Sequence, residues 1–466
     1  MNFDSIVDSL KNDIIQGTQQ IIKIKSVEEP ALPGKPFGEG VNNALEYALN
    51  LAKELGFTTK NLDGYAGYAE YGEGTQTLGI LVHLDIVPEG DGWTYPPYSA
   101  EIHQGKIYGR GAIDNKGPAI AALYALKALM NSKVALKRKV RIIFGTNEET
   151  NWGCMKHYLE KEPSPDLAFV PDSDFPLING EKGVTNVTFK FQFTTYHETA
   201  IRVEKIVGGN RSNIFPDYCQ ANISVEANII NQIKKVLENF KEDKGYQLRW
   251  EESSNLLIIK SYGISAHGSL PEKGKNAVSQ LMGFLGLLEL GESPAGKLVA
   301  FYNQYIGMEY NGQSMGIGMA DELSGKLTFN VGIIKFQENQ AEVVANIRVP
   351  IKYKIEEVVR KLEEVTKDLG ITILTGKAMN SYYIPEDDFL VQKLLQVYQA
   401  KTGDYQAKPK TIGGATYART LPKAVPFGPL FPGTIETAHE KDEHISIEDL
   451  LKSTKIYAQA IYELTR

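Results

Sequence analysis

The chain has 466 residues, of which 42% are apolar, 23% charged and 10% aromatic, a composition typical of a soluble globular protein. Its formal net charge of -7 at pH 7 argues against the basic surface that nucleic-acid binding requires. The length exceeds what a single hydrophobic core normally supports, so we expect at least two domains.

The start of the chain lacks the basic segment and apolar stretch of a secretory signal. The best candidate for a membrane span, Ala119 to Met130, is too short and contains Lys127, so no membrane partner is expected. Cys154 and Cys219 are the two cysteines, too few for a disulfide framework, and we expect both to be buried as small apolar side chains. These features together predict a cytoplasmic protein.

The first part of the chain alternates between predicted helices and strands. Helical spacing covers residues 5–25 and 40–56, the second ending at Gly56, and the apolar run that ends at Asp85 predicts a strand. A helix over 119–130, with Pro118 in its first turn, is followed by strands over 140–145 and 167–171. This alternation predicts a doubly wound α/β fold with a mainly parallel sheet.

From about Gly183 the pattern changes to alternating apolar and polar residues, which is typical of half-buried antiparallel strands. Such segments begin at Val184, Gln220, Leu256 and Ala341, and predicted helices over 228–239, 277–290 and 354–369 separate them. Helical spacing returns beyond Glu386, and a last helix is predicted over 447–464. We therefore expect a discontinuous first domain, 1–183 and 385–466, interrupted by an α+β lid domain over 184–384.

Acidic residues and histidines directly follow the predicted strands of the first domain. His83 and Asp85 follow one strand, Glu148 and Glu149 the next, and Asp172 the third, while Asp114 lies in a glycine-rich loop. The carboxyl ends of parallel strands meet at one edge of a sheet, so these groups should converge. Carboxylates and imidazoles clustered in one pocket are most easily stabilised by a divalent metal ion between them.

The spacing of two motifs suggests roles within such a site. His83 and Asp85 lie on the same side of an extended strand end, and a metal-binding histidine commonly donates its second ring N–H to a carboxylate. Of the adjacent Glu148 and Glu149, one can bind metal while the other serves as general base. A chance His-x-Asp triplet and a solvated acidic turn remain alternatives, and aspartates often only organise loops. The loop from Gly109 to Gly117 lacks the Gly-Lys-Ser/Thr ending of a phosphate-binding loop.

Taken together, the motifs resemble a known family. The order His83-x-Asp85, Gly-Arg-Gly-Ala-x-Asp114-Asn-Lys-Gly, Thr-Asn-Glu148-Glu149, Pro-Asp172 and Ala-His439 is similar to that of the co-catalytic di-zinc peptidases that include aminoacylase, carboxypeptidase G and dipeptidase V. The long insertion most resembles the dipeptidase V branch of Xaa-His dipeptidases and carnosinases. The resemblance implies a zinc-peptidase catalytic domain and a lid of two ferredoxin-like lobes.

The resemblance also implies roles for individual residues of the first domain. Asp114 would bridge two metal ions, with His83 and Asp172 on one ion and Glu149 and His439 on the other. Glu148 would be the general base, and Asp85 would orient His83. His444 is a competing ligand, but His439 fits the family pattern better. His103, His157 and His197 match no motif and are expected to be structural.

The lid would complete the site with His267 as a donor to the oxyanion, and with Asn213 and Arg348 as substrate-binding residues. Gly413, Gly414 and Thr416, in a glycine-rich segment, would bind the substrate carboxylate through their backbone N–H groups. Without the resemblance, surface or core roles for His267 and Arg348, and an ordinary turn for the glycine-rich segment, would be preferred.

The implied activity is that of a metal-dependent dipeptidase that cleaves dipeptides with a free C-terminal carboxylate, through a metal-bridging hydroxide and a glutamate base. The alternatives are a deacylase of N-acyl amino acids, such as an aminoacylase or a succinyl-diaminopimelate desuccinylase, and a non-catalytic metal-dependent binding protein. Two divalent ions are expected, Zn²⁺ first, with Mn²⁺ or Co²⁺ possible. The lid is long enough for two lobes, which predicts a monomer.

Overall fold

The computed structural model describes residues 1–194, 199–253 and 256–466, and the chain forms two compact units. The first unit consists of Met1–Asn179, Ile384–Lys410 and Thr416–Arg466, and the second of Gly180–Tyr383 and Thr411–Ala415. The first unit is thus discontinuous in sequence. The short segment Thr411–Ala415 groups with the second unit, although the sequence analysis assigned it to the first domain.

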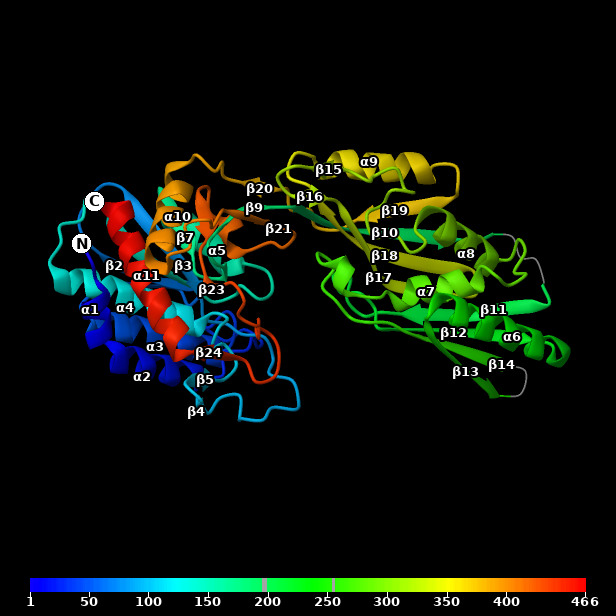
Figure 1. The fold of residues 1–466 in the computed structure, drawn as a ribbon, viewed down its shortest axis with the longest axis horizontal. Coiled ribbons are helices and arrows are strands. Elements are labelled where there is room, and N and C mark those ends of the chain that lie inside the picture. Colours follow the sequence, from blue (N-terminus) through cyan, green and yellow to red (C-terminus); the bar gives the residue numbers. More distant parts are fainter. Residues whose placement is uncertain (195–198, 254–255) are drawn as a thin grey trace. The chain divides into compact units, whose positions relative to one another are not determined.

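The central sheet of the first unit has the strand order β1-β2-β6-β3-β7-β22 (Figure 1). Neighbouring strands are parallel from β6 to β22, and antiparallel among β1, β2 and β6. The strands of this unit are β1 (Thr58–Leu62), β2 (Ala66–Tyr71), β3 (Thr77–His83), β4 (Ile102–His103), β5 (Lys106–Tyr108), β6 (Lys139–Gly145), β7 (Leu167–Val170), β8 (Ser173–Asp174), β22 (Ala424–Pro426), β23 (Pro429–Leu430) and β24 (His444–Ser446). The predicted mainly parallel α/β architecture is confirmed.

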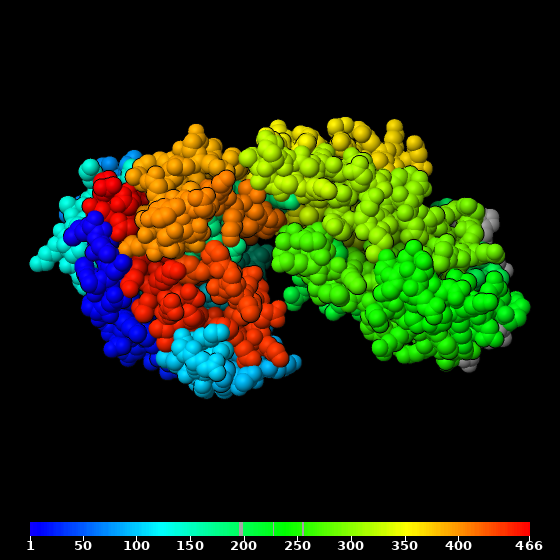
Figure 2. Space-filling view, in the orientation of Figure 1, coloured from blue at the N-terminus to red at the C-terminus, as the bar shows by residue number. Residues whose placement is uncertain are grey.

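Helices cover this sheet. They are α1 (Asp4–Ser9), α2 (Lys11–Ile22), α3 (Glu39–Glu54), α4 (Lys116–Ser132), α5 (Gly153–Lys161), α10 (Phe389–Thr402), the 3-10 helix η2 (Tyr417–Thr420) and α11 (Ile447–Thr465). Both α4 and α11 contact β3 and β6, whereas Cys154 and Met155 of α5 pack in a cluster with Leu81 and Ile143. Since neighbouring strand residues point to opposite faces, Ile80 and Ile142 face away from that cluster. The first and last helices lie side by side, the blue and red segments of Figure 2.

Several helices differ from the sequence prediction, and the one predicted over 228–239 extends from Ala227 to Lys244. The predicted helix over 5–25 is two helices that meet at Leu10, and the Ser9 hydroxyl donates to the Ile6 carbonyl at 2.7 Å, which competes with the helical backbone bonds. The predicted helix over 277–290 ends at Leu285 and is capped by Gly286. There the Met282 carbonyl accepts from the Gly286 N–H at 3.0 Å and also from the side-chain amide of Asn303 in a neighbouring helix.

The second unit contains an eight-stranded sheet of order β13-β14-β12-β11-β17-β18-β10-β19, antiparallel throughout. Helices α6 and α7 contact the half that contains β12, β13 and β14, and α9 contacts β10 and β19 in the other half, an arrangement that agrees with a two-lobed lid. The elements are β10 (Gly183–Gln192), β11 (Ile201–Gly208), β12 (Tyr218–Val225), α6 (Ala227–Lys244), β13 (Gln247–Ser253), β14 (Leu256–Tyr262), η1 (Pro271–Lys273), α7 (Ala277–Leu285), α8 (Pro294–Tyr305), β15 (Ala320–Asp321), β16 (Gly325–Lys326), β17 (Thr328–Gln337), β18 (Gln340–Val349), α9 (Ile355–Thr366) and β19 (Ile371–Thr375).

The remaining strands, β9 (Ile178–Glu181), β20 (Tyr382–Tyr383) and β21 (Lys410–Ile412), form a three-stranded sheet of order β20-β9-β21. In the part of the chain that the structure describes, no helix has both the length and the apolar character needed to cross a membrane. Both cysteines are buried and carry free thiols, as the sequence predicted.

Candidate metal centre

Three adjacent parallel strands of the first unit deliver the acidic residues and histidine that the sequence analysis singled out. His83 is the last residue of β3, which lies between β6 and β7 in the sheet. Glu148 and Glu149 follow the end of β6, and Asp172 follows the end of β7. The carboxyl ends of these strands therefore lie at one edge of the sheet, as expected for a ligand site in an open α/β fold.

The Asp114 carboxylate lies between two imidazoles. Its Oδ1 is 2.8 Å from Nε2 of His83, and its Oδ2 is 3.0 Å from Nε2 of His439. The same His439 nitrogen is 3.1 Å from Oε2 of Glu149, and Oδ2 of Asp172 is 3.6 Å from Nε2 of His83. The five predicted metal ligands thus form one connected cluster in the first unit.

Asp85 connects the cluster to the Glu148–Glu149 turn. Its two carboxylate oxygens accept hydrogen bonds from the backbone N–H groups of Glu148 and Glu149, each at 3.0 Å. His83 Nδ1 is 3.0 Å from the Asp85 carbonyl oxygen and 3.6 Å from the Asp85 carboxylate. The Asp85 main chain therefore makes the shorter contact with the His83 ring, and its side chain fixes the backbone of the two glutamates.

Asn115 was not predicted to take part in the site, but it contacts two of the ligand segments. Its side-chain oxygen accepts from the His83 backbone N–H at 3.3 Å, and its Nδ2 donates to Oδ1 of Asp172 at 3.1 Å. The sequence signal for this role is its position directly after Asp114 in the glycine-rich loop. Because asparagine is common in ordinary loops, that signal alone does not distinguish a structural residue from a ligand-orienting one.

Charge and burial within the cluster shift the pKa values of its members. Burial is the main factor that raises the pKa of Glu148 well above its usual value, and the carboxylates around it add to the effect. Burial and Asp114 likewise raise the pKa of Glu149. Hydrogen bonds that His439 donates to Asp114 and then to Glu149 raise the pKa of His439 to about 11. Protons thus supply the positive charge that this many buried carboxylates need.

A divalent metal ion fits the same donor set. One ligand atom from each of His83, Asp114 and Glu149 lies within 4.8 Å of the others, and all the donors of the cluster are carboxylate oxygens or imidazole nitrogens. Such mixed N and O donors without thiolate suit zinc and its neighbours in the first transition series. A cation would also replace the protons as the balancing charge in the cluster.

The other histidines of the first unit have neighbours of their own. His444 Nε2 is 3.0 Å from Nζ of Lys106, and its ring packs near Tyr108, which supports His439 over His444 as the ligand. His103 pairs with Glu101, and His157 pairs with Asp63, which agrees with structural roles. His197 lies outside the described residues.

In the second unit, main-chain contacts join the segments that carry Asn213 and His267. The Gly268 N–H donates to the Asn213 carbonyl at 2.7 Å, and Ile214 and His267 form an antiparallel bridge. Nδ1 of His267 is 2.5 Å from the Ser269 hydroxyl. Burial, and then the charge of Arg348, lower the pKa of His267 to about 4, so its imidazole is neutral near pH 7.

Arg348 on β18 is held by two neighbours. Its Nε donates to the Asn346 side chain at 2.7 Å, and its Nη1 donates to the Gly413 carbonyl at 3.0 Å. Gly413 and Gly414 belong to the second unit, whereas Thr416 belongs to the first, where its hydroxyl caps η2 by accepting from the Ala418 N–H. The predicted carboxylate-binding residues are therefore divided between the two units.

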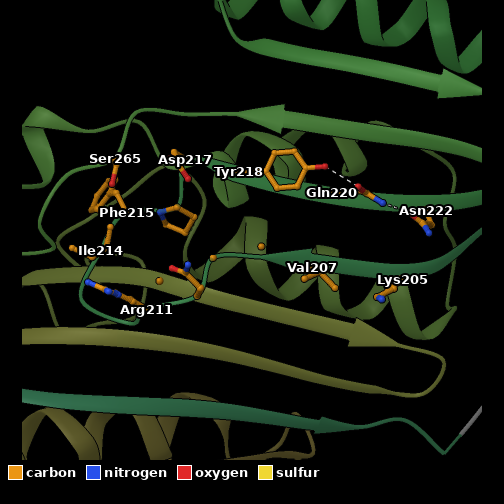
Figure 3. Close-up of a pocket in the computed structure, with 15 residues that line it drawn as sticks. Lys205, Val207, Arg211, Ile214, Phe215, Asp217, Tyr218, Gln220, Asn222 and Ser265 are labelled. Atoms are coloured by element: carbon orange, nitrogen blue, oxygen red, sulfur yellow. Dashed lines mark hydrogen bonds between the residues drawn. The ribbon is translucent and has the colours of Figure 1, made fainter. Parts of the chain in front are cut away.

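The second unit also contains a hollow of about 720 Å³ (Figure 3). Its lining includes Arg211 and Ile214, on either side of Asn213, and Ser265, close to His267 in sequence. Along β12, the Tyr218 hydroxyl donates to Gln220, whose amide donates to Asn222 (Figure 3). The hollow thus has a polar wall and is lined by sequence neighbours of Asn213 and His267, but not by Asn213, His267 or Arg348 themselves.

Comparisons with known proteins identify the family of the chain. Residues 79–463 match the model of peptidase family M20/M25/M40. The chain is 41% identical to "Putative dipeptidase YtjP" of Bacillus subtilis (strain 168), over the full length of both chains. It is 36% identical to "Putative dipeptidase" of Staphylococcus epidermidis, over 97% of both chains.

Solved structures of low sequence identity share the fold. Human carnosine dipeptidase 1 has a TM-score of 0.57 at 16% identity, with 99% of this chain and 98% of that chain covered. Aminoacylhistidine dipeptidase from Vibrio alginolyticus has a TM-score of 0.54 at 15% identity, with 95% of each chain covered. The extent of the family match and the identity to full-length relatives establish that the chain is a metallopeptidase of family M20/M25/M40.

Proposed function

We propose that the chain is a dipeptidase that cleaves the peptide bond of dipeptides with a free C-terminal carboxylate. The observation that carries the proposal is the position of the Asp114 carboxylate, with one oxygen near His83 and the other near His439. A carboxylate with one oxygen directed to each of two ligand groups suits a bridge between two ions. The relatives named as putative dipeptidases support the substrate class.

The metal ions would be held by His83, Asp114 and Asp172 on one side and by Asp114, Glu149 and His439 on the other. Ions bound there supply Lewis acidity, which polarises the scissile carbonyl and lowers the pKa of the attacking water. Zn²⁺ is the proposed metal, and Mn²⁺ and Co²⁺ are the alternatives that the donor set accepts.

Glu148 is the proposed general base. Asp85 fixes its backbone N–H at 3.0 Å, and burial raises the pKa of its carboxyl group, which makes its carboxylate a better proton acceptor. It takes a proton from the attacking water and delivers it to the leaving amine. Asp85 thereby acts as a positioning residue for Glu148 and Glu149 at once.

Residues of the second unit, with Thr416 of the first, are proposed to bind the substrate. His267, neutral near pH 7 because burial lowers its pKa, donates a hydrogen bond to the oxyanion of the tetrahedral intermediate. Arg348, with backbone N–H groups of Gly413, Gly414 and Thr416, binds the substrate carboxylate through its planar fork, and Asn213 assists. We further propose a cytoplasmic monomer that supplies all these residues from one chain.

A substrate panel tests the proposal. The protein is depleted of metal and assayed with dipeptides, tripeptides and N-acyl amino acids, each with added Zn²⁺, Mn²⁺ or Co²⁺. We expect turnover of dipeptides and no turnover of N-acetyl or N-succinyl amino acids. Hydrolysis confined to the acyl substrates would replace the proposal with a deacylase, and metal binding without hydrolysis would indicate a binding protein.

A further inference from the structure

A buried ion pair lies beside the metal cluster without belonging to it. Nη1 of Arg110 is 2.7 Å from Oε2 of Glu443, and the two side chains are 2% and 0% exposed. Desolvation makes such a pair a poor source of stability, and its best-attested use is to specify one arrangement of the chain. The pair therefore suggests a requirement for precise placement at this point of the fold.

Glu443 binds the backbone of the loop that carries Asp114. Its Oε1 accepts hydrogen bonds from the Ile113 N–H at 3.0 Å and the Asp114 N–H at 3.2 Å. Its own carbonyl accepts from the Gly109 N–H at 2.9 Å. These contacts fix both ends of the loop from Gly109 to Asp114 against one residue.

The same ion pair reaches two further ligand segments. Glu443 lies four residues after His439, in a segment that continues into β24, which pairs with β5 just before the loop. Nη2 of Arg110 is 3.3 Å from the Glu89 carbonyl oxygen, in the segment that follows His83 and Asp85. The Arg110–Glu443 pair thus connects the segments that carry His83, Asp114 and His439.

We propose that Glu443, with Arg110, is a positioning residue that holds Asp114 and His439 at the separation needed to bind the metal ions. The inference rests on the proposed metal site and extends it to a residue that does not bind metal itself. Loss of Glu443 frees the Ile113 and Asp114 N–H groups and releases the Asp114 loop from the His439 segment. The ions then bind more weakly, even where the fold persists.

The test compares Zn²⁺ affinity, measured by competition with a chromogenic chelator, in the parent protein and two variants. Glu443→Met, which leaves the Ile113 and Asp114 N–H groups without a side-chain acceptor, should weaken Zn²⁺ binding at least tenfold. The control is Glu162→Met, which removes the carboxylate of another largely buried pair in the first unit, 3.0 Å from Arg141. The control should keep the parent affinity. Unchanged Zn²⁺ affinity in Glu443→Met, or an equal loss in Glu162→Met, would overturn the inference.

A double variant separates positioning from stability. In Arg110→Met with Glu443→Met, apolar side chains of similar length replace both charges, so no unpaired charge is left buried. We expect the metal-free double variant to melt at a higher temperature than metal-free Glu443→Met, in which Arg110 is left buried without its partner. Zn²⁺ binding should be equally weak in both, because the two N–H groups lack their acceptor in both. Parent-like Zn²⁺ affinity in this variant would refute the role of Glu443. A parent protein that binds no Zn²⁺ would refute the metal site itself.

Discussion

The two units of the chain hold their candidate residues in different ways. In the first unit, side chains from adjacent parallel strands meet directly, and Asp114 contacts both His83 and His439. In the second unit, main-chain hydrogen bonds hold the segments of Asn213 and His267 together. Parallel strands bring their carboxyl ends to one edge, whereas antiparallel strands alternate in direction. The first unit is therefore suited to chemistry at a charged cluster, and the second to holding individual neutral or cationic donors.

The largest expected effect falls on the first unit. Glu148→Gln removes the proposed base while keeping its size, and kcat should fall by about 10²- to 10⁴-fold, with Zn²⁺ content unchanged. The matched control is Glu160→Gln, an exposed glutamate on α5, which should keep the parent kcat. If Glu148→Gln kept the parent kcat, Glu148 would not be the base, and the first unit would no longer differ from the second by supplying it.

His267→Ala tests the contribution of the second unit to the transition state. Loss of a single oxyanion donor lowers kcat by about 10²- to 10³-fold, and metal content should not change because His267 is not a proposed ligand. His157→Ala, which replaces a histidine paired with Asp63, is the control and should leave kcat intact. A full loss of bound Zn²⁺ in His267→Ala would instead assign His267 to the metal cluster.

Arg348→Lys sharpens the role of the second unit in binding. Lysine keeps the charge but not the planar fork, so KM for a dipeptide should rise by about ten- to a hundredfold, the equivalent of one hydrogen bond to a charged group. The change in kcat should be smaller. Steady-state kinetics measures both constants, and Arg360→Lys, on the exposed face of α9 beside Glu364, is the control. A loss confined to kcat would contradict a carboxylate-binding role.

The smallest expected effect concerns stability against pH. Burial and then Arg348 lower the pKa of His267 to about 4, below its value of about 6.5 in an unfolded chain. The unfolded state therefore binds more protons between these values, and stability falls as the pH drops from 6.5 towards 4. His267→Ala should lose less stability than the parent between pH 7 and pH 5, by a few degrees in Tm. Equal losses in both proteins would show that His267 is not held neutral by the fold.

The clustering of these acidic and histidine side chains could be predicted from the sequence because its signals are local. His83 is the last residue of an apolar strand, and Glu148 and Asp172 come shortly after two others, so the geometry of a parallel sheet implies that they meet. A two-domain layout could also be predicted from the sequence. The pattern changes from alternating helices and strands to strands in which apolar and polar residues alternate, and this change marks the start of the second domain. The roles of individual ligands came from family resemblance, and the distances between them are consistent with those roles.

Contacts between residues that are far apart in the sequence could not be predicted from local patterns. Arg110 and Glu443 are separated by 333 positions, and each resembles an ordinary surface charge until the fold buries both. The last turn of α7 also contacts Asn303 from another helix, which no local pattern around Gly286 reveals. The Asp85 carboxylate contacts the Glu148–Glu149 backbone because two strands lie side by side, a relation that a single strand motif does not contain.

The segment Thr411–Ala415 limits how this protein can be divided into fragments. The Ile412 carbonyl accepts from the Lys182 N–H, the Thr411 hydroxyl donates to the Leu323 carbonyl, and the Gly413 carbonyl accepts from Arg348. A recombinant lid made only from Gly180 to Tyr383 would lack these five residues and with them the Gly413 contact of Arg348. A fragment that reproduces the native environment of Arg348 therefore needs this short peptide grafted back, and any domain exchange between relatives has to transfer both pieces together.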